Sequence, residues 1–334
     1  MSIKKLEKIM SAFPSFRLKQ TKEAIFHKLI SSWNESNLPK DIKEKLSIEF
    51  PVEFKSELSI NDDQASVKAK IFFTKDEIVE TVLMKHKDGR NTVCVSSQIG
   101  CPLKCVFCAT GNLGLRRNLT AWEIIIQVLV IARFLKKSKE KISNVVFMGM
   151  GEPFLNYDEV MHAINILNNE QYFNIGARKI SISTAGIITG IQKLEKEKLQ
   201  INLAISLHAP NNILRSKLMP INDNYNIDGL LKIVANYITN TRRRVMIEYL
   251  LIKNINDSEK EANELVLLLK KYFNDLFFIN LIPCNPTEKY QASSNKQIKE
   301  FKNILENNGI FVVQRYSFGH KITGACGQLA GEKN

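Results

Sequence analysis

The order of apolar and polar residues divides the chain into stretches with different periods. Residues 1–50 carry apolar side chains at helical spacing among lysines and glutamines, and Leu38-Pro39 separates two predicted helical parts. Over residues 67–73, apolar and charged side chains alternate instead. This alternation predicts two or three strands between residues 52 and 93, with turns near Asn61-Asp62 and Lys87-Asp88-Gly89.

From residue 92 onward, short apolar strands alternate with amphipathic helices. We predict strands over residues 92–96, 144–148, 179–183, 201–207, 244–252 and 277–282, with a further strand over 310–315. We predict helices over residues 120–137, 157–168, 190–198, 227–239, 258–273 and 294–308. Six strands joined by helices indicate an α/β fold with a parallel sheet. Because no Gly-x-Gly-x-x-Gly follows the first strand, we expect a partial (β/α)6 barrel rather than a dinucleotide-binding sheet.

Composition and charge narrow the class of protein. The chain has 334 residues, of which 44% are apolar and 24% charged, and this balance excludes disordered, collagen-like and coiled-coil proteins. The longest apolar run, 124–132, is interrupted by Gln127 and is too short for a membrane span, and the N-terminus leads into no signal-peptide core. We therefore expect a cytoplasmic protein without a membrane partner. The net charge of +13 favours nucleic acid as a partner, with a solvated lysine-rich surface as the alternative.

The cysteines carry the strongest chemical signal. Cys101, Cys105 and Cys108 form a C-x3-C-x2-C run directly after the first predicted core strand, the edge at which barrels of this kind place their chemistry. A structural zinc site or a ferredoxin would supply a fourth protein ligand. Three thiolates leave one position of a metal centre open, as catalytic sites do. Zinc binding and burial as ordinary core cysteines are the alternatives.

Seven motifs surround this loop in a fixed order. They are Cys94-Val-Ser-Ser-Gln-Ile-Gly-Cys101, Phe107-Cys-Ala-Thr-Gly111, Gly149-Met-Gly-Glu-Pro153, Ser183-Thr-Ala-Gly186, Ser206-Leu-His-Ala-Pro210, Asn280-Leu-Ile-Pro-Cys-Asn-Pro286 and Ala325-Cys-Gly-Gln-Leu329. From about residue 15 to the C-terminus, the sequence resembles the RlmN/Cfr family of radical S-adenosylmethionine (radical SAM) RNA methyltransferases. The resemblance implies three units: a helical RNA-binding accessory domain over 1–50, a β extension over 51–91, and a radical SAM (β/α)6 core over 92–334 that ends in a catalytic tail.

The resemblance also implies roles for individual residues. Cys101, Cys105 and Cys108 would hold a [4Fe-4S] cluster, which binds SAM. Cys326 would accept a methyl group from one of two SAM molecules used per turnover, and Cys94 would release the product by forming a disulfide with it. Glu80 would be the general base. The residues implied in SAM binding are Gly151, Glu152, Ser183, Ser206, Leu207, His208 and Asn285.

Several of these residues have plainer interpretations from the sequence alone. Cys326 could be an incidental exposed thiol, Cys94 a buried strand cysteine, and Glu80 a polar position on an alternating strand. His208 is expected to be structural rather than an acid or base. Cys284 stands where the family has an aromatic residue, and we interpret it as structural.

The implied reaction is methylation of C2 of an adenine, namely adenine 2503 of 23S rRNA and adenine 37 of tRNA. This C–H bond is not acidic and its carbon has no lone pair, which makes a radical route more plausible than polar methyl transfer. A flavodoxin-type reductant and a monomeric enzyme are expected. Two basic runs, Arg116-Arg117 and Arg242-Arg-Arg244, are candidates for RNA phosphate contacts, with a solvated surface as the alternative.

Three other functions compete with this one. The C8-methylating antibiotic-resistance branch of the same family shares the cluster loop and both reactive cysteines. Its motifs read Gly-Glu-Ala and Leu-Ile-Arg-Tyr, whereas this chain has Gly151-Glu152-Pro153 and Leu281-Ile282-Pro283-Cys284, which favours C2. A non-catalytic RNA-binding protein with a structural metal would not need Cys326. An iron–sulfur electron carrier would have a fourth cluster cysteine.

Overall fold

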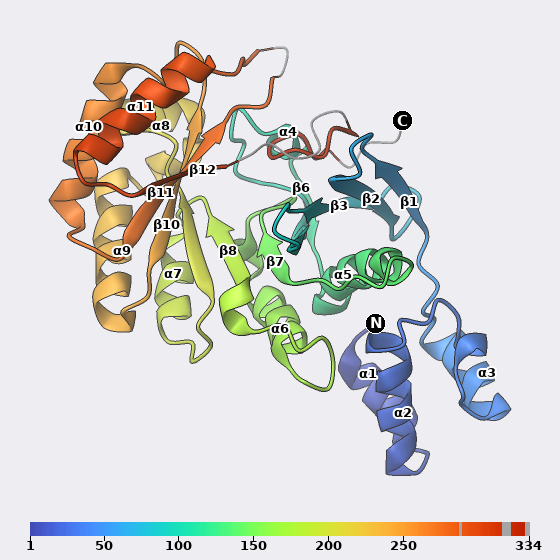
Figure 1. Cartoon of the computed structure of the whole chain (residues 1–334). Helices are drawn as coiled ribbons and strands as arrows, with labels where there is room; N and C mark the ends of the chain where they lie inside the picture. The colour runs from blue at the N-terminus through green and yellow to red at the C-terminus, as the bar shows by residue number, and fades with distance from the viewer. Residues whose placement is uncertain (287–288, 316–321, 331–334) are drawn as a thin grey trace.

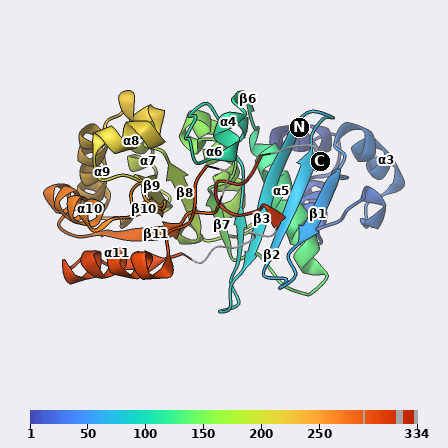
Figure 2. The same cartoon turned by 90° about the horizontal axis from the view of Figure 1, so that it is seen from above.

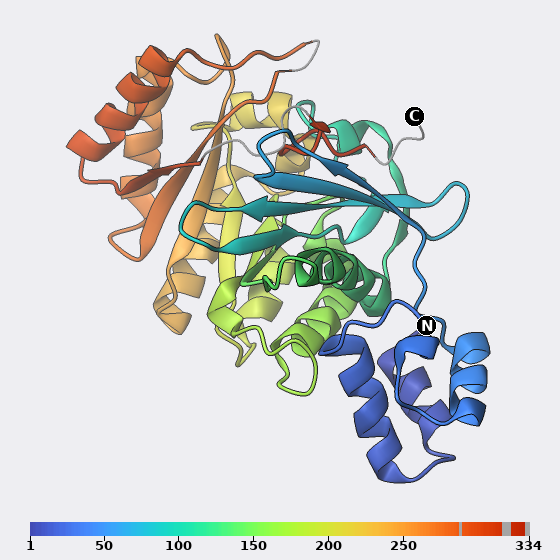
Figure 3. The ribbon, with the colours of Figure 1, turned by 45° about the vertical axis from the view of Figure 1, so that its right-hand side comes forward.

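The N-terminal residues form a small helical unit. The computed structural model describes residues 1–286, 289–315 and 322–330. Its first elements are α1 (Ile3–Met10), α2 (Ser15–Phe26), the 3-10 turn η1 (Trp33–Glu35) and α3 (Lys40–Glu49). The fully buried Trp33 joins them, and its Nε1 donates to the Phe50 carbonyl at 2.8 Å. The prediction of helices over residues 1–50 is confirmed, and the unit lies at one end of the molecule (Figure 3).

One large sheet runs through the rest of the described chain. Its strands are β1 (Ser56–Ile60), β2 (Ser66–Phe72), β3 (Ile78–Lys85), β4 (Asn91–Cys94), β7 (Asn144–Phe147), β8 (Ile180–Thr184), β9 (Asn202–Ser206), β10 (Val245–Leu251), β11 (Phe277–Pro283) and β12 (Val312–Gln314), and they follow this order across the sheet. From β4 to β12 all neighbours pair in parallel, which confirms the predicted core strands. Strands β1 to β3 continue the same sheet in antiparallel fashion, so the predicted β extension is joined to the core through β3 and β4.

Helices cover the outer side of this sheet. They are α5 (Ala121–Lys136), α6 (Tyr157–Asn168), α7 (Ile188–Glu195), α9 (Ile227–Thr241), α10 (Glu259–Tyr272) and α11 (Asn295–Asn307). A capping box of Thr120 and Glu123 begins α5, where the sequence predicted a helix over residues 120–137. Seen from above, the strands curve with the helices outside and the C-terminal segment on the inner side beside β3 (Figures 1 and 2). This arrangement is the open, partial barrel that the sequence predicts.

Several short elements are absent from the sequence prediction. They are β5 (Gln98–Gly100), α4 (Ala109–Asn112), β6 (Leu115–Asn118), α8 (Asn212–Leu218) and the 3-10 turns η2 (Pro153–Asn156), η3 (Ala177–Lys179) and η4 (Pro220–Asp223). Each spans at most seven residues and lies outside the longer apolar stretches on which the prediction rests. Strands β5 and β6 pair antiparallel in a separate two-stranded sheet, and the three cysteines of the C-x3-C-x2-C loop lie between them in the chain.

No helix within the described ranges is long and apolar enough to cross a membrane.

Candidate active site

A cavity lies at the carboxyl ends of the parallel strands, on the inner side of the sheet. Residues at the end of β4 and just after β7, β8, β9 and β11 line it, as expected for a barrel of this type. Of the residues singled out from the sequence, the cavity wall contains Cys94, Cys101, Cys105, Cys108, Gly151, Glu152, Ser183, Ser206, His208, Asn285 and Cys326. Leu207 and Glu80 are not part of the wall.

The cysteine loop is held at its base by the small sheet. The Cys101 amide donates to the Gly114 carbonyl at 2.9 Å. Gly100 has φ +77°, and a Cβ there would lie 1.8 Å from that carbonyl oxygen, so glycine is required. The Val106 amide donates to the Leu218 carbonyl at 3.0 Å, which ties the loop to the barrel.

The three loop thiols line the same cavity. Burial raises the pKa of Cys101 to about 12, and the neighbouring Cys108 raises it further. Burial, Cys108 and Cys101 also raise the pKa of Cys105. Among the described residues, no three His, Cys, Asp or Glu side chains converge on a point suited to one metal ion. Three cysteine thiols on one loop of a shared cavity are of the ligand type that holds iron–sulfur clusters.

The loop after β7 brings a carboxylate into the cavity. Gly151 has φ +99°, and a Cβ there would lie 2.5 Å from the Gln98 Cβ. The Glu152 amide donates to Gln98 Oε1 at 2.9 Å, while its carboxylate accepts from the Phe154 and Ala185 amides at 3.0 and 2.7 Å. Burial raises the pKa of Glu152 to about 7. The oxygens keep lone pairs that a ligand amine can use.

A second carboxylate in the cavity was missed by the sequence analysis. Glu248 lies within β10 and is 4% exposed. It accepts from Ser183 Oγ at 2.5 Å and from Ser206 Oγ at 3.5 Å, so it orients both predicted SAM-binding serines. Arg315, which follows β12, lies 3.9 Å from it. A single carboxylate in an otherwise apolar buried strand was the signal that could have identified it.

His208 is held neutral. Its φ is +58°, and its Nδ1 accepts from the Leu250 amide at 3.0 Å. Burial and the nearby Arg215 lower its pKa to about 3. This agrees with the expectation that His208 is not an acid or base. Leu207 is fully buried, and its backbone carbonyl accepts from Arg215 instead of facing the cavity.

The C-terminal tail carries Cys326 into the cavity. Asn285 Nδ2 donates to the Cys326 carbonyl at 2.9 Å, and the Ala109 amide donates to the Gly327 carbonyl at 2.8 Å. Cys326 is exposed and lines the cavity, and desolvation by the surrounding protein raises the pKa of its thiol to about 11, opposed by the positive charge of Arg315. The sequence implied a SAM contact for Asn285, and the structure shows its amide holding the tail.

Two further thiols share the cavity with Cys326. All six cysteines are free, so the structure contains no disulfide between Cys94 and Cys326. Cys94 is 8% exposed at the end of β4, and burial raises its pKa to about 12, with Cys326 among the neighbours that raise it further. Cys284 is 5% exposed and forms part of the cavity wall, which the sequence did not indicate.

Glu80 occupies a protected position behind the tail. It lies on β3 with 2% exposure, and its Oε1 is 3.1 Å from Lys68 Nζ on the neighbouring strand. Its Oε2 accepts from the Ala330 amide at 3.0 Å. Because side chains two residues apart point to the same face, Glu80 faces the same side as Val82 and Met84, which line the cavity.

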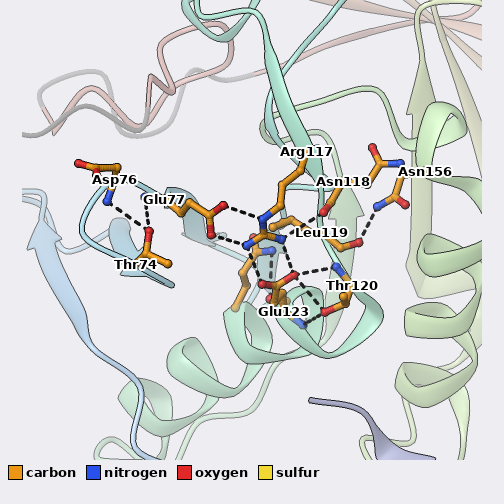
Figure 4. A network of polar contacts seen from close by, with 10 residues as sticks. Thr74, Asp76, Glu77, Arg117, Asn118, Leu119, Thr120, Glu123 and Asn156 are labelled. Carbon is orange, nitrogen blue, oxygen red and sulfur yellow. Dashed lines mark hydrogen bonds and ion pairs between the residues drawn. The ribbon is translucent and has the colours of Figure 1, made fainter.

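The expectation that Arg117 contacts RNA phosphate is not supported by its position. It binds both oxygens of Glu77 and both of Glu123 at 2.7–2.9 Å, within the network that begins α5 (Figure 4). Charge-assisted bonds of this kind contribute about 1.5–3 kcal/mol each before solvent screening. Arg117 therefore links Glu77, which directly precedes β3, to Glu123 in the first turn of α5. Arg116 is exposed and donates to the Asp76 carbonyl at 2.6 Å.

The second basic run, residues 242–244, lies at the end of the sheet opposite to the cavity. Residues 242–244 precede β10, so they lie at the amino ends of the strands, away from the cavity. Arg243 donates to the Glu197 carbonyl at 2.9 Å, and the Arg244 guanidinium lies 4.7 Å from the centre of the Phe278 ring. We do not expect this run to contact RNA that enters the cavity.

Comparison with known proteins places the chain in a family. The radical SAM superfamily profile matches residues 95–266. "Probable dual-specificity RNA methyltransferase RlmN" of Dictyoglomus turgidum is 48% identical over 95% of this chain and 90% of its own length. The protein of the same name from Bacillus cytotoxicus is 42% identical over 96% of this chain and 88% of its own. A crystal structure of a radical SAM methyltransferase from Sphaerobacter thermophilus superposes with a TM-score of 0.94 at 39% identity, covering 99% of this chain and 98% of that one.

Fold, cavity and relatives lead to the same assignment. The chain belongs to the radical SAM superfamily and, within it, to the RlmN family of RNA methyltransferases. The family implies a [4Fe-4S] cluster and SAM, and the three loop thiols and the adjoining carboxylates and hydroxyls of the cavity fit this pair.

Gly151, which follows β7, allows a test of whether its loop contributes to SAM binding. We expect Gly151→Ala to weaken SAM binding at least about tenfold, because the strained φ and the contact with Gln98 displace Glu152. Titration of SAM into the cluster-loaded protein measures this. Gly176→Ala is the matched control, since a Cβ at Gly176 would meet no atom within 4 Å and its φ is −57°. Equal SAM affinity of the two variants would contradict this role for the glycine loop.

Proposed function

We propose that this protein methylates C2 of adenine 2503 in 23S rRNA and of adenine 37 in tRNA, using Cys326 as a methyl carrier and two SAM molecules per turnover. The observation that carries the proposal is that Cys326 and Cys94, which are far apart in sequence, line one cavity with the cluster loop. The relatives at 41–48% identity, named as dual-specificity RNA methyltransferases, support the substrate class.

Cys101, Cys105 and Cys108 would hold the cluster, which together with bound SAM would supply a methyl group and a carbon-centred radical. Side chains of this protein bind and orient the reacting groups. Glu152 is placed to accept hydrogen bonds from the SAM amine. Glu248 keeps the hydroxyls of Ser183 and Ser206 oriented toward the cavity. Asn285 fixes the backbone of the methyl-carrying residue.

Cys326 carries the methyl group and then becomes linked through it to the adenine, in two stages. Its thiolate first accepts a methyl group, and loss of one hydrogen atom from this S-methyl group leaves a carbon radical that adds to C2 of the adenine. The adduct gives up its unpaired electron to an external electron carrier of the flavodoxin type, and Glu80 removes the C2 proton, which restores the aromatic ring. The Cys94 thiolate then attacks the Cys326 sulfur, so that the S–S bond forms as the S–C bond breaks; the electron pair of the broken bond stays on the methylene carbon, which takes a proton to become the methyl group. The same kind of carrier, in its reduced form, supplies the electrons that SAM cleavage and reduction of the disulfide require. The adenine must leave its stack to reach the cavity, and the N-terminal helices are proposed to hold the surrounding RNA.

The position of methylation is tested by the identity of the product. We would incubate the reconstituted protein anaerobically with SAM, a reductant and a 23S rRNA fragment, and then digest the RNA to nucleosides. Chromatography and mass spectrometry would compare the methylated nucleoside with authentic standards. The expected product is 2-methyladenosine. The motifs Gly151-Glu152-Pro153 and Pro283-Cys284 favour this outcome over C8. 8-Methyladenosine, or methylation absent despite SAM cleavage, would overturn the proposal.

A further inference from the structure

The two ends of the segment that carries Cys326 are fastened to the same ion pair. Lys68 Nζ on β2 donates to Thr323 Oγ1 at 2.8 Å, and Glu80 Oε2 on β3 accepts from the Ala330 amide at 3.0 Å. Lys68 and Glu80 are themselves paired at 3.1 Å. Cys326 lies between these two attachment points, three residues after the first and four before the second.

This ion pair is protected from water. The side chains of Lys68 and Glu80 are 7% and 3% exposed. Isolated charges are costly to bury, so such a pair persists only when each partner satisfies the other and finds further hydrogen bonds. Here the tail supplies these further bonds at Thr323 and Ala330. The pair and the tail therefore stabilise each other.

The tail conformation itself needs external support. Thr323 has φ +48°, a left-handed conformation that β-branched residues rarely adopt. Such a conformation persists only where the surroundings hold it. Lys68 provides one such contact, from a strand 255 residues away in the sequence.

We propose that Lys68 is a positioning residue: together with Glu80 it anchors the tail segment 322–330 and thereby holds Cys326 in the cavity. Its significance for methyl transfer rests on the proposed function, but the anchor itself does not.

The test is hydrogen–deuterium exchange of the full-length protein without RNA, followed by mass spectrometry of peptides from the tail and from the sheet. In Lys68→Met, we expect exchange of the tail amides to be about tenfold faster or more, as loss of charge-assisted bonds implies. Lys68→Arg should restore most of the protection. Lys85→Met is the matched control, because Lys85 lies in the same sheet and pairs with Glu140 at 2.9 Å, and it should leave tail exchange unchanged.

A milder variant keeps the test decisive if Lys68→Met disturbs the sheet. Thr323→Val removes the hydroxyl, which accepts from Lys68 and donates to the Ile322 carbonyl at 2.8 Å, and keeps the side-chain shape and the Lys68–Glu80 ion pair. It should accelerate tail exchange while the peptides of β2 and β3 exchange as in the unaltered protein. Unchanged tail exchange in Thr323→Val, or equal acceleration in Lys68→Met and Lys85→Met, would overturn the anchor.

Methyl loading of Cys326 provides the functional readout. The rate of Cys326 methylation, followed by peptide mass spectrometry at saturating SAM, should fall in Lys68→Met and recover in Lys68→Arg, with the SAM affinity unchanged. A fall that Lys68→Arg does not reverse would contradict positioning by this side chain. If tail exchange responds as expected but no C2-methylated RNA forms in the unaltered protein, the anchor stands and the proposed function fails.

Discussion

Replacing Cys326 with alanine is expected to reduce RNA methylation by at least about 10³-fold, because alanine has no sulfur to carry the methyl group. The cluster and SAM binding should persist, since Cys101, Cys105 and Cys108 lie on a different loop, which small strands hold in place. The measurement combines iron content, visible absorbance, SAM cleavage and methylated nucleoside in one anaerobic preparation.

Cys284→Ala is the matched control for this experiment. Cys284 is another thiol of the same cavity wall, but it lies after β11 and not on the tail. We expect this variant to retain methylation. An equal loss of RNA methylation in Cys284→Ala and Cys326→Ala would mean that methylation depends on the shape of the cavity and not on the thiol of the tail. Methylation that survives in Cys326→Ala would rule out the methyl-carrier mechanism.

Replacing Cys94 with alanine is expected to stop the reaction after the RNA has become attached to the protein. The product would then remain bound through a carbon–sulfur bond to Cys326, since no thiol attacks that sulfur. Denaturing electrophoresis with labelled RNA should show a protein–RNA adduct that a thiol reductant does not release. Multiple turnover to free methylated RNA would be at least about tenfold slower.

The same control distinguishes the Cys94 effect from a general disturbance. Cys284→Ala should form free product without accumulation of the adduct. Free methylated RNA released by Cys94→Ala at the rate of the unaltered protein would contradict the assignment of Cys94. An adduct from which a thiol reductant releases the RNA would also contradict this role of Cys94, because a thioether does not undergo thiol exchange.

The sequence allowed most of the barrel to be predicted because most of its elements lie in stretches with a clear apolar pattern. Strands β4, β7 and β12 have only three or four residues, but they lie in longer apolar stretches bounded by polar turns, and α5 begins with a recognisable capping box. Strands β5 and β6 are as short, but each contains a single large apolar residue beside polar residues or glycine. They show no apolar pattern, so the small sheet that supports the cysteine loop could not be predicted.

The site was predictable where a motif identified it and not where distant parts of the chain meet. The cluster cysteines and Cys326 stand in recognisable motifs. The ion pairs of Arg117 could not be predicted, because a basic dipeptide does not reveal two glutamates, Glu77 and Glu123, that become its partners in the fold. The Lys68–Glu80 pair alternates with apolar residues as on any half-buried strand, and its contacts to the tail depend on tertiary structure alone.

The most direct test of the account uses SAM whose transferable methyl group carries deuterium in all three positions. Anaerobic turnover with 23S rRNA is followed by mass spectrometry of the methylated adenosine. If the methyl group rests on Cys326 and loses one hydrogen atom before it joins C2, the product is 2-methyladenosine that retains two deuterium atoms. A product with all three deuterium atoms would show direct transfer from SAM and would contradict the central role of Cys326.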